Sequence, residues 1–186
     1  MKLIITRHGL TEGNAKRILA DIDDELNSEG VEQVRKLSKR LEKERIAAIY
    51  CSPLIRAKKT AEIIAKNHPN AKVIFSDDLR EMDLGSYLNK GFDDVDWENM
   101  PDDVESRTSM YKRAKIVLEK VIKEYPDGTV LFVSHNALNK ALIRFLRGWN
   151  PEDKQPIHQD NAAVTIFEIK CNEVKEILFN DTKHLE

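Results

Sequence analysis

The chain has 186 residues, with 30 lysines and arginines against 32 aspartates and glutamates, and a formal net charge of -2 at pH 7. This near balance disfavours a general nucleic-acid binder, which would carry a basic surface. No apolar run approaches the ~18 residues of a membrane-spanning helix, and the apolar start is too short for a signal peptide. We therefore expect a cytoplasmic protein of one domain, residues 1–186, without nucleic-acid or membrane partners.

Cysteines and three of the five histidines stand outside any metal-binding or catalytic spacing. Cys51 and Cys171 lack CxxC or Cys/His spacing, which predicts small core residues rather than a disulfide or a zinc site. His68, His158 and His184 lie in hydrophilic stretches, so we expect them to face solvent.

Short apolar segments alternate along the chain with longer amphipathic ones. Buried strands are predicted at 2–6, 46–51, 72–75 and 129–134, because these segments are short and rich in β-branched residues. Helices are predicted at 28–44, 52–67, 103–124 and 137–147. The first of these helices opens with Asn27 or Ser28 as its cap, and the second with the Ser52 hydroxyl followed by Pro53.

The C-terminal part of the chain follows a different pattern. Two strands, 162–170 and 174–179, are joined by Cys171-Asn172-Glu173 and predict a hairpin. Together with the strand-helix alternation before it, this pattern predicts an α/β fold of three layers. A mostly parallel sheet would carry helices on both faces and the hairpin at one end.

Three loops at the carboxyl ends of predicted parallel strands hold the residues of greatest chemical interest. Ligands bind at this edge of a parallel sheet. The loops contain Arg7 and His8, then Arg56, then His135, and Asn14 adds a hydrogen-bond donor to the first. Arginines beside helix N-termini form an anion site suited to a phosphoryl group.

Two histidines among arginines favour phosphoryl chemistry over metal binding. A guanidinium cluster repels cations and no carboxylate stands at metal-ligand spacing, so no metal is expected. A neutral imidazole can attack phosphorus and form a phosphohistidine, while the arginines and the second histidine neutralise the phosphoryl oxygens. The leaving group needs a proton, and Glu81 and Asp83 are both candidates to supply it.

These segments resemble the histidine phosphatase superfamily, in the branch that contains cofactor-dependent phosphoglycerate mutases and many small phosphatases. The matching segments run in family order over residues 4–168. They are 5–14 (ITRHGLTEGN), 26–33 (LNSEGVEQ), 52–61 (SPLIRAKKTA), 79–85 (LREMDLG), 133–135 (VSH) and 161–165 (NAAVT).

The resemblance implies a phosphoglycerate mutase-like fold and a set of residue roles. His8 would be the phosphorylated nucleophile. Glu81 would be the acid/base, preferred over Asp83 because it holds the matching place. The residues that would bind the phosphate are Arg7, Asn14, Arg56 and His135. No metal or other cofactor is implied.

The chain also departs from the family pattern. Leu10 replaces an acidic residue or glutamine, Asn136 replaces a glycine, and 85–89 (GSYLN) replaces Gly-x-Trp-Glu-Gly beside the substrate. Segment 93–105 holds seven acidic residues and no basic one. If this segment covers the pocket, as the resemblance implies, it repels a second anion; otherwise it is a solvated loop far from the substrate.

Three functions follow from this pattern. The leading hypothesis is a phosphomonoester hydrolase acting through phospho-His8 on a small phosphorylated metabolite, with a neutral or cationic remainder preferred. A phosphoglycerate mutase is the alternative, in which case Lys90 or Arg107 would contact a second anion. An inactive phosphate-binding or partner-binding module is disfavoured because every catalytic group is present. The sequence leaves the physiological substrate and the oligomeric state open.

Overall fold

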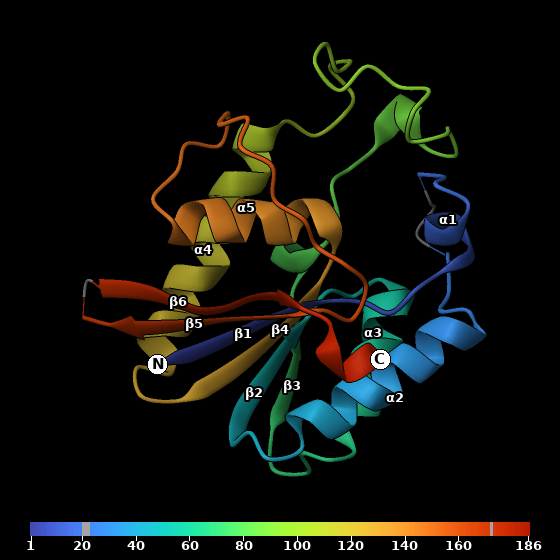
Figure 1. Ribbon diagram of the computed structural model, residues 1–186. Helices are drawn as coiled ribbons and strands as arrows, with labels where there is room; N and C mark the ends of the chain where they lie inside the picture. The colour runs from blue at the N-terminus through green and yellow to red at the C-terminus, as the bar shows by residue number, and fades with distance from the viewer. Residues whose placement is uncertain (20–22, 172) are drawn as a thin grey trace.

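A single sheet forms the middle layer of the molecule (Figure 1). The computed structural model describes residues 1–19, 23–171 and 173–186, and within these residues the sheet has six strands. In spatial order they are β3 (Lys72–Phe75), β2 (Ile46–Cys51), β4 (Thr129–Ser134), β1 (Lys2–Arg7), β5 (Val164–Lys170) and β6 (Glu173–Asp181). The first four are mutually parallel, and β5 and β6 pair antiparallel. The predicted fold class, with its terminal hairpin, is confirmed.

Helices cover both faces of this sheet (Figure 1). The long helices are α2 (Ser28–Leu41), α3 (Ile55–Ala65), α4 (Arg107–Glu124) and α5 (Asn136–Leu146). Because neighbouring strand residues point to opposite faces, Leu3 and Ile5 join the core under α4 and α5, whereas Ile4 joins the core under α2 and α3. Burial on both faces explains why the central strands are continuous apolar runs. In the described part of the chain, no helix has the length and apolar character needed to cross a membrane.

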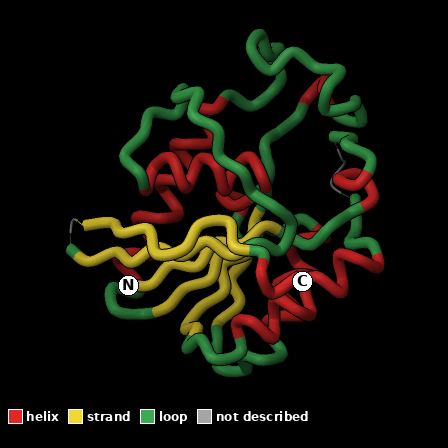
Figure 2. Tube along the Cα trace, viewed as in Figure 1, coloured by secondary structure: helices red, strands yellow, loops and turns green. Residues whose placement is uncertain are grey.

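A long excursion with little regular structure separates β3 from α4 (Figure 2). It contains the short 3-10 helices η1 (Asp77–Leu79) and η2 (Gly85–Tyr87), and we call residues 84–104 the cover segment. This segment lies against the chain that follows the short helix α1 (Glu12–Ala15): Leu19 N donates to Lys90 O at 2.9 Å, and Phe92 N to Arg17 O at 2.8 Å. A last 3-10 turn, η3 (Lys183–Leu185), ends the chain.

Several predicted boundaries are wrong by a few residues. Helix α3 begins at Ile55, not at Ser52, because Leu54 is still extended and the Ser52 hydroxyl accepts from Leu54 N in a turn. Helix α2 is capped by Asn27, whose Oδ1 accepts from Gly30 N at 2.8 Å, and it ends at Leu41. Helix α4 begins only at Arg107. In the predicted hairpin connection, Asn172 lies outside the described residues, and Glu173 already belongs to β6.

Some burial predictions are also wrong. Among the described residues, β3 is an edge strand that pairs only with β2, so Val73 and Phe75 are 41% and 49% exposed rather than buried. Cys51 is buried as expected, but Cys171 is exposed at the end of β5. His68 is buried instead of facing solvent. His158 is exposed as expected, whereas His184 is half-buried.

Candidate active site

The pairing of β1 with β4 brings two histidines together at one edge of the sheet. Arg7 at the end of β1 is paired with Ser134 at the end of β4, so the next residues, His8 and His135, lie side by side. Their ring centroids are 5.1 Å apart and both side chains are buried. His8 N donates to Ser134 O at 3.0 Å, which ties the two loops together.

The ring of His8 is oriented by the backbone beside it. Its Nδ1 lies 2.7 Å from Gly9 O, and because a carbonyl only accepts, Nδ1 carries the proton and Nε2 keeps a lone pair. Burial, followed by the charges of Arg7 and Arg56, lowers the pKa of His8 well below its ordinary value. The imidazole is therefore neutral at neutral pH, as a nucleophile must be.

The ring of His135 is oriented through its other nitrogen, Nε2, by a serine side chain. Its Nε2 lies 2.8 Å from Ser52 Oγ, while its buried Nδ1 has no hydrogen-bond partner among the described residues. Burial, His8 and the two arginines lower the pKa of His135 well below its ordinary value. If the Ser52 hydroxyl donates to Nε2, the neutral ring presents Nδ1–H as a donor for an anion.

Two arginines complete the positive wall around His8. Arg7 donates from one terminal nitrogen to Gln159 O at 3.0 Å, and its buried Nε has no partner among the residues described. Arg56 lies in the first turn of α3 and is 5% exposed. Unsatisfied buried donors are costly unless a ligand meets them. An anion with several acceptor oxygens suits this arrangement.

The start of α2 supports the loop that carries His8. A Cβ on Gly9 would lie 2.5 Å from Gly30 O, and a Cβ on Gly30 would overlap the Leu10 backbone, so the two backbones touch. Gln33 Oε1 accepts from Leu10 N at 3.0 Å. Segment 26–33 therefore packs against the loop that carries His8 and supports it.

The two candidate acids occupy different places. Glu81 lines the same cavity as His8, and its Oε1 accepts from Ala137 N at 3.0 Å at the N-terminus of α5. Asp83 does not line that cavity, and its Oδ1 accepts from Gly85 N at 3.1 Å. Of the two carboxylates, only Glu81 lines the cavity that holds His8.

A cavity of about 1060 Å³ opens above His8, between α5 and the cover segment. Of the six site residues predicted from the sequence, five line it, namely Arg7, His8, Asn14, Arg56 and Glu81. His135 does not line the cavity and lies beside His8 instead. Asn161 also lines it and donates to His8 O at 2.9 Å and to Asn14 Oδ1 at 3.0 Å.

Four basic residues of α4, α5 and the loop after α5 also line this cavity and form a basic wall, namely Arg107, Lys140, Arg144 and Lys154. Arg107 was selected from the sequence as a possible contact for a second anion, but the other three were missed. Lys140 forms no ion pair with any residue that the structure describes. Burial lowers the pKa of its ammonium group, and the charge of Glu81 acts to raise it. Helical spacing was the available signal, because positions 136, 137, 140, 141 and 144 share one face of α5 and all line the cavity.

The acidic stretch 93–105 places fewer carboxylates at the cavity than expected. It borders the cavity, but of its seven carboxylates only that of Glu98 lines it, with Lys154 Nζ at 3.2 Å. Asp93 pairs with Arg17 at 2.7 Å. The whole lining holds seven arginines and lysines against four carboxylates, so the cavity is basic. Lys90 lies outside it, over the Tyr87 ring.

The fold and this site define an α/β protein with a buried neutral histidine in a basic pocket. The sequence model of the histidine phosphatase superfamily (branch 1) matches residues 3–182, and the chain belongs to this family. The resemblance of the sequence segments is thereby confirmed.

Known relatives cover nearly the whole chain. Phosphoserine phosphatase 1 of Hydrogenobacter thermophilus is 30% identical, with 100% of this chain and 94% of the relative covered. Phosphoglycerate mutase-like protein 4 of Arabidopsis thaliana is 29% identical, with 100% and 87% covered. Among solved structures, YhfR of Bacillus stearothermophilus superposes with a TM-score of 0.90 at 27% identity, covering 100% of this chain and 99% of that chain.

Proposed function

We propose that this chain is a phosphomonoester hydrolase that transfers the phosphoryl group of a small phosphorylated metabolite to His8 and then to water. The observation that carries the proposal is the buried neutral imidazole of His8, whose Nδ1 is committed to Gly9 O. Its Nε2 lone pair is thereby available in a cavity that also holds Arg7 and Arg56. The phosphatase names of the relatives support the same reaction.

In the first half of the reaction, His8 Nε2 forms a bond to phosphorus and the bond from phosphorus to the ester oxygen breaks. The phosphoryl oxygens are held by the guanidinium groups of Arg7 and Arg56 and by the Asn14 amide, and the neutral His135 ring beside His8 donates from Nδ1. A proton on Glu81 passes to the leaving oxygen. The products of this half are the alcohol and phospho-His8.

In the second half, water attacks the phosphorus of phospho-His8. Glu81, now a carboxylate, takes a proton from that water as the nitrogen–phosphorus bond breaks. Inorganic phosphate leaves and His8 regains its lone pair. Glu81 therefore acts as acid and then as base from one position at the N-terminus of α5.

A phosphoglycerate mutase remains the second candidate because the basic wall suits a substrate with a second anionic group. Lys140 and Arg107 both line the cavity on that side. A mutase would return the phosphoryl group to another hydroxyl instead of to water. The same wall removes our reason for expecting a neutral or cationic remainder, and we now favour substrates that carry a carboxylate.

Phosphate release separates these candidates. The protein is mixed with phosphoserine or 3-phosphoglycerate, with and without 2,3-bisphosphoglycerate, while inorganic phosphate and 2-phosphoglycerate are followed. A phosphatase releases phosphate without the bisphosphate. Faster formation of 2-phosphoglycerate would move the mutase to first place, and no turnover of any ester, including 4-nitrophenyl phosphate, would favour a non-catalytic module.

A further inference from the structure

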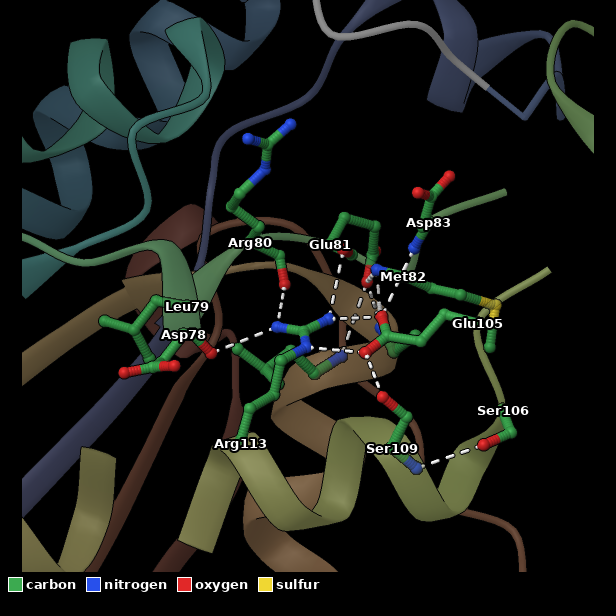
Figure 3. A network of polar contacts seen from close by, with 12 residues as sticks. Asp78, Leu79, Arg80, Glu81, Met82, Asp83, Glu105, Ser106, Ser109 and Arg113 are labelled. Carbon is green, nitrogen blue, oxygen red and sulfur yellow. Dashed lines mark hydrogen bonds and ion pairs between the residues drawn. The ribbon is translucent and has the colours of Figure 1, made fainter. Parts of the chain in front are cut away.

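Arg113 of α4 lies under the segment that carries Glu81 (Figure 3). A guanidinium has five N–H donors, and all five are used here. Three of them go to backbone carbonyls of one short segment: Asp78 O at 3.0 Å, Arg80 O at 2.6 Å and Glu81 O at 3.1 Å. The other two go to Glu105 Oε1 at 2.8 Å and Oε2 at 2.7 Å.

Glu105 supplies the opposite charge at the base of the cover segment. Its side chain and that of Arg113 are 13% and 16% exposed, so the pair is largely shielded from water. Burial alone would raise the pKa of Glu105, but the bonds from Arg113 and Ser109 bring it below its ordinary value. Glu105 N also donates to Asp83 O at 2.8 Å. This hydrogen bond joins the two residues that flank the cover segment.

Glu81 is consequently held from two helices. The N-terminus of α5 binds its carboxylate through Ala137 N and Leu138 N, and α4 binds its carbonyl through Arg113. The two helices pack against each other. Loss of Arg113 would leave three carbonyls without their donor and would free the segment to shift relative to α5. An acid displaced by about 1 Å can cost on the order of 10²-fold in rate.

We propose that Arg113, with Glu105 as its counter-charge, is a positioning residue that sets where Glu81 meets the leaving oxygen. The inference rests on the proposed role of Glu81 as the acid. It gives α4 a part in the reaction although Arg113 does not line the cavity that holds His8.

The test compares two esters that differ in their need for an acid. Alkoxide leaving from glycerol phosphate needs a proton, whereas 4-nitrophenolate leaves as a stable anion. We measure kcat/KM, because it reports only the steps up to release of the alcohol and does not include the later attack of water. Arg113→Met should lower kcat/KM for glycerol phosphate by about 10–100-fold and for 4-nitrophenyl phosphate by less than about threefold. Arg113→Lys, whose three donors share one atom, should fail to rescue the selective loss.

Arg147→Met is the matched control. Arg147 makes a comparable two-bond pair with Glu176, at 2.9 and 3.2 Å, but does not line the cavity. This control should lower stability and leave the ratio of the two esters unchanged. Adding Arg113→Met to Glu81→Gln should have little further effect on glycerol phosphate, because the acid is already absent.

Three results would overturn the inference, and they differ in cause. If Glu81→Gln is selective but Arg113→Met lowers both esters equally, Arg113 is merely structural and the proposed function stands. If Glu81→Gln itself lowers both equally, the acid role fails and the inference falls with it. Should Arg113→Met not fold, Arg113→Lys decides, and an unchanged ratio of the esters in that variant contradicts the proposal.

Discussion

Lys140 lines the cavity from α5, an amphipathic helix. Lysines on amphipathic helices mostly face solvent, and only the register of α5 against the sheet turns this one toward Glu81. The same applies to Arg113, because its role depends on where the acid segment crosses α4. By contrast, His8 and His135 were predictable, since each directly follows a buried parallel strand.

Removing Lys140 should change substrate preference more than chemistry. We expect Lys140→Met to raise KM for 3-phosphoglycerate by about 10-fold, the size of a charge-assisted hydrogen bond, and to leave glycerol phosphate nearly unchanged. The two esters differ in one group, because 3-phosphoglycerate carries a carboxylate where glycerol 3-phosphate carries a hydroxymethyl group. Steady-state kinetics with both substrates checks this, with Lys112→Met on the exposed side of α4 as control. An equal rise in KM for both esters would show that Lys140 does not read the carboxylate.

At the level of elements, the contact between α2 and the loop that carries His8 depends on glycine. Gly30→Ala should drive a methyl group into the Leu10 backbone and displace the loop of His8. Overpacking of this kind costs ~1–3 kcal/mol, and we expect a loss of stability of that size together with a fall in kcat. Urea unfolding and turnover of 4-nitrophenyl phosphate measure the two effects.

Gly128→Ala is the control for that substitution. The Cβ added there would lie 3.3 Å from Tyr125 Cβ, a tight contact far from His8 on the chain before β4. It should cost less stability and leave kcat unchanged. If Gly30→Ala keeps full activity, the contact is packing alone and α2 does not position the loop.

Elements were predictable from the sequence where one local rule governs them. The Asn27 cap and the buried face of α2 follow from helical spacing and capping chemistry. The start of α3 could not be predicted in this way, because the Ser52 hydroxyl contacts His135 and a turn instead of capping the helix. The exposure of β3 could not be predicted either, because the sequence of an apolar strand is similar at the edge and in the middle of a sheet.

For the whole molecule, the buried histidines predict a loss of stability in acid. The pKa values of His8 and His135 lie well below 6.5 in the folded state, so the unfolded chain binds more protons as pH falls below about 6.5. The free energy of unfolding therefore decreases as the pH is lowered through that range, by up to about 1.4 kcal/mol per pH unit for each histidine. The pKa values of His68 and His184 are lowered as well and add to the same trend.

Urea unfolding at pH 7.5, 6.5 and 5.5 in phosphate-free buffer checks this trend. Phosphate is excluded because an anion bound to the folded state would add stability of its own. His8→Asn should reduce the slope below pH 6.5, whereas His158→Asn, which changes an exposed histidine, should not. Equal slopes for His8→Asn and the unchanged chain would contradict the burial of a neutral His8.

The most direct test of the account is to trap the phosphoryl group during turnover. The protein is mixed rapidly with labelled substrate and denatured without acid, and the labelled peptide is identified by mass spectrometry. We predict a phosphoprotein that survives base, is lost in acid, maps to His8 and is absent from His8→Ala. A phosphoryl group that maps to another residue, or that persists in His8→Ala, would contradict the account.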